Sequence, residues 1–150
     1  MNELNAYKLA CSGHTEEYMS EHIDKVYQMC KNVYGNDHDL NVVAILHDYL
    51  EDVKGATAEQ LLTAGFSCAI VEAVEALTRK KGEDYDYYLY CAFQNDLASK
   101  VKKIDIICNI LRNIGTDSRR ALYYTNKLSD LLRLSAIFEG DNNAKHCETT

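Results

Sequence analysis

The stretch AILHDYLEDV, residues 44–53, combines an apolar helical pattern with four ionisable side chains. Its six apolar residues enclose the pair His47-Asp48, and the pair Glu51-Asp52 begins four residues later. If the stretch is one helix, each member of the second pair stacks one turn from its counterpart in the first. Burying such groups without partners costs several kcal/mol. We therefore expect a strong partner for them, and a metal ion is the obvious one.

Length and composition predict a single all-α domain. A chain of 150 residues can bury roughly 68–70% of its unfolded surface. It contains no proline and only seven glycines, which favours helices joined by short turns. Apolar periodicity predicts a helical bundle of six to eight helices over residues 1–138, with the central helix at about 39–53 and the last at 117–138. Residues 139–150 are polar and are predicted to form a disordered tail.

The charge and the cysteines limit the class of protein. A formal net charge of −7 argues against binding nucleic acid through its phosphates. Binding of an anionic small molecule is still compatible with this net charge, because a bound divalent cation reverses the local potential. Six cysteines without a C-x-x-C pair favour reduced thiols in a cytoplasmic protein. We expect no membrane span and no export, since no apolar run reaches about 18 residues and no signal leads the chain. The sequence contains no feature that predicts the oligomeric state.

Imidazole nitrogen and carboxylate oxygen are ligands that a first-row divalent ion accepts while keeping positions open for water and substrate. His47 and Asp48 supply one of each. The remaining ligands must come from other helices. His22 lies on the apolar face of the preceding predicted helix, and Asp105 is set in the apolar segment VKKIDIICNIL, residues 101–111. An unpaired carboxylate in that setting would be costly, so both residues are candidate ligands.

Ordinary structural roles remain open for these residues. His22 could be a satisfied core histidine, and Asp105 could pair with Arg112 or with Lys102. Asn109 follows one turn after Asp105 and could bond a neighbouring helix. Together they form a polar stripe along an otherwise buried helix. The joint pattern favours a metal site: HDxxED in an apolar helix, a histidine upstream and an apolar-flanked aspartate downstream.

The order of these residues resembles a known family. The pattern H…HD…D is that of the HD-domain superfamily of metal-dependent phosphohydrolases. LHDYLEDV, residues 46–53, looks like the LHDxxED segment of the RelA/SpoT-type (p)ppGpp hydrolase domain, and VKKIDIICN, residues 101–109, resembles that group's KLADRLHN segment. Residues 56–66 and 72–88 are similar to small stand-alone members of the superfamily. The resemblance covers roughly residues 13–134.

The resemblance implies a single HD-domain helical bundle with one divalent ion, usually manganese, and a nucleotide as substrate. The implied ligands are His22, His47, Asp48 and Asp105. Glu51 and Asp52 would orient or deprotonate the attacking water, a division of labour that the physical chemistry supports. Asn109 stands in the matching place of the family segment and is a candidate substrate contact, as are Lys102 and Arg112.

Three departures from the family pattern bear on the substrate. The (p)ppGpp hydrolases carry a basic, proline-containing segment before the first metal histidine, whereas residues 12–21 read SGHTEEYMSE, which is acidic. KLAD has become KKID, and Cys108 replaces the histidine before the final asparagine. Hydrolysis at a phosphate is therefore better supported than (p)ppGpp as the substrate. Phosphate contacts could come instead from Lys102, Arg112 or residues 79–81, although a solvated loop is the favoured interpretation of that trio.

Other polar and aromatic residues have less specific predictions. The tyrosines at 85, 87, 88 and 90 could stack on a base, although a tyrosine stripe on a helix is more often buried. His14, His38 and His146 are predicted to be surface histidines.

The leading hypothesis is a metal-dependent phosphohydrolase that acts on a nucleotide, with (p)ppGpp 3′-pyrophosphohydrolase as the first candidate. One alternative is a phosphatase of another nucleotide, and a second is a non-catalytic nucleotide-binding module that keeps the fold and the ion. The pair Glu51-Asp52 favours an enzyme, because a pure binder has no need of a water-activating pair. A nuclease is disfavoured by the charge.

Overall fold

A computed structural model describes the backbone of residues 2–147 and the side chains of residues 2–130, 132 and 133. No strand occurs in this part of the chain, which confirms the predicted all-α class. Eight helices in residues 2–147 have six residues or more, within the predicted range: α1 (Glu3–Gly13), α3 (Asp24–Tyr34), α4 (His38–Leu46), α6 (Ala58–Thr63), α7 (Cys68–Leu77), α8 (Tyr85–Phe93), α9 (Asp96–Asn113) and α10 (Ser118–Cys147). The shorter segments are α2 (Glu16–Tyr18), the π-helical η1 (Met19–Ile23) and α5 (Tyr49–Asp52).

Polar side chains at the helix starts accept backbone N–H groups and fix where the helices begin. Thr15 caps α2, and Thr57 and Gln60 form a capping box at the start of α6 with both of its hydrogen bonds. Asp37 caps α4 and Asn95 caps α9 in the same way. These two caps set the register of the helices that lead to the predicted ligands on the central stretch and on α9.

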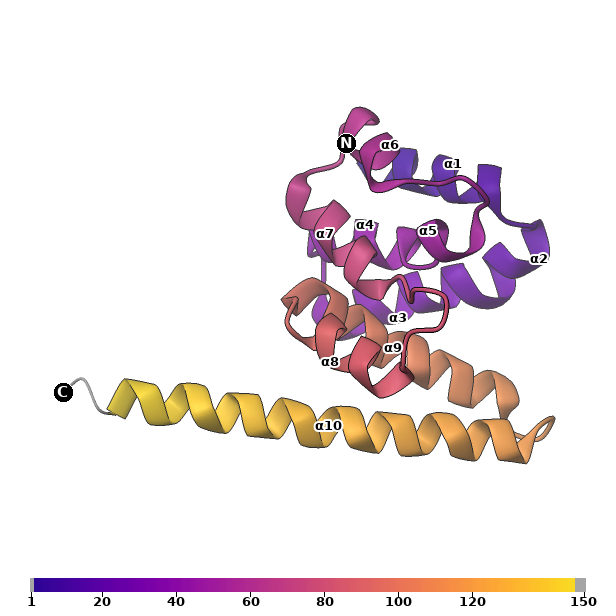
Figure 1. Ribbon diagram of the computed structural model, residues 1–150. Helices are drawn as coiled ribbons and strands as arrows, with labels where there is room; N and C mark the ends of the chain where they lie inside the picture. Colours follow the sequence, from indigo (N-terminus) through magenta and orange to yellow (C-terminus); the bar gives the residue numbers. More distant parts are fainter. Residues whose placement is uncertain (1, 148–150) are drawn as a thin grey trace.

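The helix α4 is the centre of the domain. Its residues 40–46 are all buried. It packs against α1, α3, α7 and α9, and in Figure 1 it runs through the middle of the body, with α1 on one side and α3 and α9 on the other. A helix that is apolar on every side is buried all round. The residues that follow it directly, His47 and Asp48, therefore lie inside the domain.

The prediction of one continuous central helix over residues 39–53 is wrong. The helix α4 ends at Leu46 and α5 begins at Tyr49, with His47 and Asp48 in the turn between them. Asp48 has φ −102° and ψ 0°, in the bridge region where active-site residues are frequent. In an unbroken helix two neighbours point about 100° apart. The turn instead brings His47 Nε2 and Asp48 Oδ2 within 3.0 Å. Apolar periodicity continues through the turn, so it could not reveal the break.

The last helix, α10, packs along α9 and α8, and Figure 1 shows it extending past the body toward the C-terminal end. It continues to Cys147, beyond the predicted end at residue 138, and so includes residues 139–147 that the sequence assigned to a disordered tail. A polar composition limits burial but does not prevent backbone hydrogen bonding in a helix. Residues 148–150 lie outside the described part of the chain.

Two further expectations concern cysteines and membranes. The cysteines with described side chains, at positions 11, 30, 68, 91 and 108, are free thiols, in keeping with the predicted reduced state. Among residues 2–147, no helix has both the length and the apolar character that crossing a membrane requires.

Candidate metal centre

His22 is placed by an irregular turn. It lies in η1, where the Asp24 N–H bonds to the Met19 carbonyl in the i→i+5 pattern of a π-helix. Such wide turns are rare and frequently occur at functional sites. The side chain of His22 is only 3% exposed, and its neighbours Met19 and Ile23 are buried in the apolar core. The π-turn thus directs an imidazole into the interior between α4 and α9.

The four predicted ligands meet in one small volume. The Nε2 atoms of His22 and His47 are 3.2 Å apart. Asp48 Oδ2 lies 3.3 Å from His22 Nε2 and 3.0 Å from His47 Nε2. Asp105 Oδ1, from the middle of α9, lies 3.2 Å from His22 Nε2 and 3.9 Å from His47 Nε2. Three segments that are 25 and 57 residues apart in the sequence therefore bring two nitrogens and two oxygens together.

This spacing fits a divalent ion. Ligand atoms at about 2.1 Å from an ion lie about 3.0–3.4 Å from one another in octahedral or tetrahedral coordination. His47 Nδ1 donates to the Ala44 carbonyl at 2.8 Å, which leaves Nε2 as the ligand atom, and this is the usual arrangement of a metal-binding histidine. His22, His47 and Asp48 could hold the ion, with Asp105 adjacent. Two imidazoles and carboxylates suit manganese, iron or zinc.

The ionisable groups of the centre change one another's pKa values. Burial disfavours the ionised form of Asp105, but Lys102 Nζ at 2.8 Å and His22 hold the pKa of that carboxyl below its usual value. Burial also opposes protonation of His22, yet hydrogen bonds to Asp105 and Asp48 raise its pKa to about 9. Protons thus offset the negative charge at the position where a cation would do so.

Tyr18 is a site residue that the sequence reasoning missed. Its hydroxyl donates to Asp48 Oδ2 at 2.6 Å, and burial followed by the charge of Asp48 raises the pKa of this tyrosine. Such a hydrogen bond orients a ligating carboxylate. The available signal was spacing, because Tyr18 precedes His22 by one helical turn and shares its face.

Glu51 and Asp52 lie at the exposed edge of the centre and differ in how they are held. Glu51 Oε2 accepts the backbone N–H of Arg79 at 3.1 Å. Asp52 Oδ2 lies 3.7 Å from His14 Nε2. Burial and the nearby charge of Asp48 raise the pKa of Asp52, and burial also raises that of Glu51. A raised pKa makes a carboxylate a better proton acceptor.

The centre opens into a cavity of about 310 Å³ with a largely polar lining. All three predicted substrate contacts border it, but each already has a partner. Lys102 pairs with Asp105, and Asn109 Nδ2 donates to Asp105 Oδ1 at 2.7 Å. Arg112 donates to Asn109 Oδ1 at 3.0 Å. Asn109 therefore bonds within its own helix and not to a neighbouring one, and Arg112 keeps donors for a ligand because only one nitrogen is used.

The three basic residues at positions 79–81 do not lie in the same place. Arg79 lines the cavity, where its guanidinium donates to the Glu83 carbonyl and lies 5.4 Å from the centre of the Tyr85 ring. Lys80 lines a different cavity, and Lys81 is exposed. The sequence could not separate these residues, because a loop lacks the periodicity that assigns side chains to faces.

The tyrosines at positions 85, 87, 88 and 90 also differ in their surroundings. Tyr88 is buried and donates to the Leu77 carbonyl at 2.6 Å, as the structural alternative expected. Tyr87 and Tyr90 are exposed. Tyr85 lines the cavity together with Tyr123 and Tyr124 of α10, neither of which the sequence singled out. Three tyrosines thus line the same cavity as the candidate ligands His22, Asp48 and Asp105.

The prediction that His14 is a surface histidine is wrong. Its side chain is 4% exposed, and its ring stacks on Tyr18 with centroids 5.2 Å apart. Its neighbours in the sequence are polar, but α1 docks against α5 there and the ring is buried. His38 is exposed as predicted, and the side chain of His146 lies outside the described residues.

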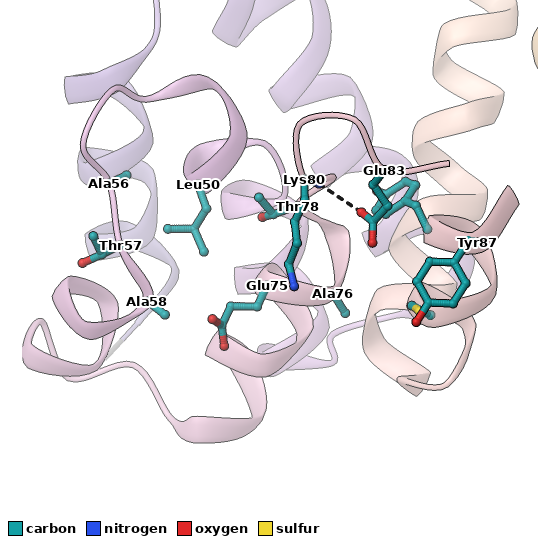
Figure 2. Close-up of a pocket in the computed structure, with 12 residues that line it drawn as sticks. Leu50, Ala56, Thr57, Ala58, Glu75, Ala76, Thr78, Lys80, Glu83 and Tyr87 are labelled. Atoms are coloured by element: carbon teal, nitrogen blue, oxygen red, sulfur yellow. Dashed lines mark hydrogen bonds between the residues drawn. The ribbon is translucent and has the colours of Figure 1, made fainter. Parts of the chain in front are cut away.

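A larger cavity of about 570 Å³ lies beside the site and contains none of the predicted metal ligands (Figure 2). Figure 2 shows Glu75 and Lys80 at this cavity, with the Lys80 N–H bonded to the Glu83 carboxylate. Thr78 and Lys80 line this cavity whereas Arg79 lines the smaller one, so the segment 78–80 separates the two.

No protein-family model matches the sequence. A search of curated proteins gives no match either. The chemistry of the site is therefore inferred from its own side chains and their geometry.

Proposed function

We propose that this protein is a metal-dependent phosphohydrolase of the HD type that acts on a nucleotide. One observation carries the proposal: Nε2 of His22, Nε2 of His47, Asp48 Oδ2 and Asp105 Oδ1 converge with neighbouring separations of 3.0–3.9 Å. Such a cluster inside an apolar domain is costly without a cation. Manganese is the first candidate for that cation.

The proposed reaction divides between the ion and the protein. When bound, a divalent ion lowers the pKa of water and offsets the charge of the phosphate. Asp52 is the candidate for accepting the proton of the attacking water, since its raised pKa suits a general base. Glu51, held by the Arg79 N–H, is the candidate for orienting that water.

A nucleotide is the proposed substrate because the cavity pairs cations with aromatic rings. Arg79 and Arg112 can contact phosphate oxygens, and guanidinium groups suit that role. Tyr85, Tyr123 and Tyr124 line the same cavity, and aromatic rings are suited to contact with a base. Guanosine polyphosphate stays the first candidate, with release of the 3′-pyrophosphate.

A phosphatase of another nucleotide is the second candidate, and one contact favours it. Lys102 is bound to Asp105, which leaves the cavity fewer uncommitted cations for a pyrophosphate group. The segment before His22 adds none, because Glu16 and Glu17 lie in α2 and Glu21 pairs with Lys25. A substrate with a single phosphate needs less positive charge.

The test is a phosphate- and pyrophosphate-release screen with purified protein and Mn²⁺. The panel includes ppGpp, dNTPs, nucleoside monophosphates and cyclic nucleotides. Asp105→Ala is the blank, and Asp96→Ala, an exposed aspartate on the same helix, is the matched control. We expect product with wild type and Asp96→Ala and none with the blank. Pyrophosphate from ppGpp selects the first candidate, and single phosphate from another nucleotide selects the second. If Mn²⁺ is bound but no substrate is turned over, the result would contradict an enzymatic function and would favour the non-catalytic nucleotide-binding module.

A further inference from the structure

One buried imidazole at the edge of the site has an atom without a hydrogen-bond partner. His14 Nε2 and Asn41 Oδ1 are the two such side-chain atoms in the described residues. Asn41 bonds to Glu3 at the far end of α4, whereas His14 Nε2 faces Asp52 Oδ2 at 3.7 Å. An unpartnered polar atom in the interior costs stability. Because His14 Nε2 lies beside the Asp52 carboxylate, a candidate catalytic group, the unpartnered atom can have a functional role.

The orientation of the His14 ring is determined by its neighbours. Nδ1 lies 3.1 Å from the Ala10 carbonyl oxygen, the ring stacks on Tyr18, and Tyr49 meets it edge-on at 6.4 Å. A carbonyl oxygen only accepts, so Nδ1 must carry the hydrogen. In the neutral ring Nε2 is then an acceptor, and it faces a carboxylate that also only accepts. The two atoms need a hydrogen between them.

We propose that His14 is a positioning residue for Asp52, within the proposed hydrolytic function: its Nε2 accepts a hydrogen bond from the Asp52 carboxyl once that group has taken a proton. In this step one O–H bond of the attacking water breaks and its oxygen bonds to phosphorus. The P–O bond to the leaving group breaks, and the proton becomes the O–H of Asp52. The new hydrogen bond exists only after the transfer, so it favours the transfer without stabilising the starting state.

Glu51 and Asp52 differ in how firmly their carboxylates are held, and this decides which of them can form the hydrogen bond to His14. Asp52 is the last residue of α5, its side chain is 46% exposed, and no backbone N–H outside α5 is bonded to its carboxylate among the described residues. Closing the gap to about 2.7–2.8 Å requires a shift of about 1 Å. Glu51 is instead anchored by the Arg79 N–H. His14 therefore supports Asp52, and not Glu51, as the proton acceptor.

The first test is a double-mutant cycle between positions 14 and 52, measured on bis(p-nitrophenyl) phosphate with Mn²⁺. His14→Phe keeps a ring against Tyr18 and removes both nitrogens. We expect kcat to fall about tenfold with KM unchanged. In an Asp52→Asn background, which has no carboxylate to protonate, the same change should alter kcat less than about twofold. His38→Phe, at an exposed histidine, is the matched control and should leave kcat within about twofold.

The second test needs no activity. In metal-free full-length protein, Asp52→Asn places an amide N–H donor opposite His14 Nε2. The ¹⁵N resonance of Nε2 should move toward the value of a hydrogen-bonded acceptor, while the ring resonances of His38 stay in place. The proposal would be overturned if the effects of the two substitutions on kcat were additive. It would also be overturned if the ¹⁵N resonance of His14 Nε2 did not change in Asp52→Asn. A wild type that hydrolyses no phosphate ester would instead overturn the proposed function, and the NMR response would separately show whether the contact between positions 14 and 52 is right.

Discussion

Lys102 Nζ donates to Asp105 Oδ2 at 2.8 Å, and both side chains lie largely inside the domain, one turn apart on α9. The pairing keeps Asp105 ionised against the effect of burial. Its other oxygen, Oδ1, stays directed at His22 Nε2, 3.2 Å away. Lys102 thus supports a candidate ligand, which confirms the predicted alternative that Asp105 pairs with Lys102. The sequence also suggested Lys102 as a substrate contact.

Replacing Lys102 by Met should destabilise the protein more than it weakens substrate binding. The change leaves a buried carboxylate without its cation, and breaking a buried pair costs about 3–5 kcal/mol. Urea unfolding of the metal-free protein measures it. Lys100→Met is the matched control, because Lys100 pairs with the exposed Asp96 on the same helix and should lose less than about 1 kcal/mol. Equal stability of the two variants, with a raised KM in Lys102→Met alone, would make Lys102 a substrate contact.

Binding of Mn²⁺ should stabilise wild type and leave His47→Ala unchanged. A ligand that binds only the folded state at 100 times its Kd adds about 2.7 kcal/mol to the free energy of unfolding. His47→Ala removes one ligand and leaves Asp48 and Asp105 close together, so it should also unfold at a lower temperature than wild type. Thermal unfolding with and without Mn²⁺ measures both effects, with His38→Ala as the control. A Mn²⁺-dependent rise in Tm that persists in His47→Ala would place the ion elsewhere.

The sequence predicted the candidate ligands better than the local backbone that presents them. Residue type and apolar context identified His22, His47, Asp48 and Asp105, because an ionisable group in an apolar helix is costly whatever the exact geometry. The break at residues 47–48 carries no proline or glycine, so periodicity missed it. The role of His14 was missed because its neighbour Asp52 is distant in sequence and the docking of α1 against α5 brings the two together. For Tyr18 the one-turn spacing from His22 was the available signal, but its partner Asp48 is also distant in sequence.

The metal-free protein should lose stability as the pH rises from about 6.5 to about 9. The pKa of His22 is raised to about 9 from 6.5, so its protonated form stabilises the fold fully below 6.5, and that contribution disappears as the pH passes through 9. The loss is of order 3 kcal/mol. Urea unfolding in the presence of a chelator measures it, and His22→Asn should flatten the slope. A flat profile in wild type would contradict the assigned contacts.

The same protonation predicts that metal binding releases protons. At pH 7.5 His22 carries a proton that it must lose before it can ligate. Calorimetric titration with Mn²⁺ in buffers of different ionisation enthalpy should therefore report a net release of protons, to which His47 also contributes because, despite its burial, the nearby charge of Asp48 raises its pKa as well. Lower affinity at pH 6.5 than at pH 8.5 should accompany it. Binding without proton release would show that His22 is not a ligand.

His14→Phe should stabilise the protein while it slows turnover. The buried Nε2 lacks a partner, which costs about 1–3 kcal/mol, and phenylalanine removes that cost while keeping a ring beside Tyr18. The Ala10 carbonyl keeps a partner, because it also accepts the backbone N–H of His14 at 3.0 Å. We expect the free energy of unfolding to rise by about 1 kcal/mol in urea. A stable but slower enzyme would mark His14 as a residue used for function at the expense of stability. Loss of stability together with activity would instead make it a packing residue.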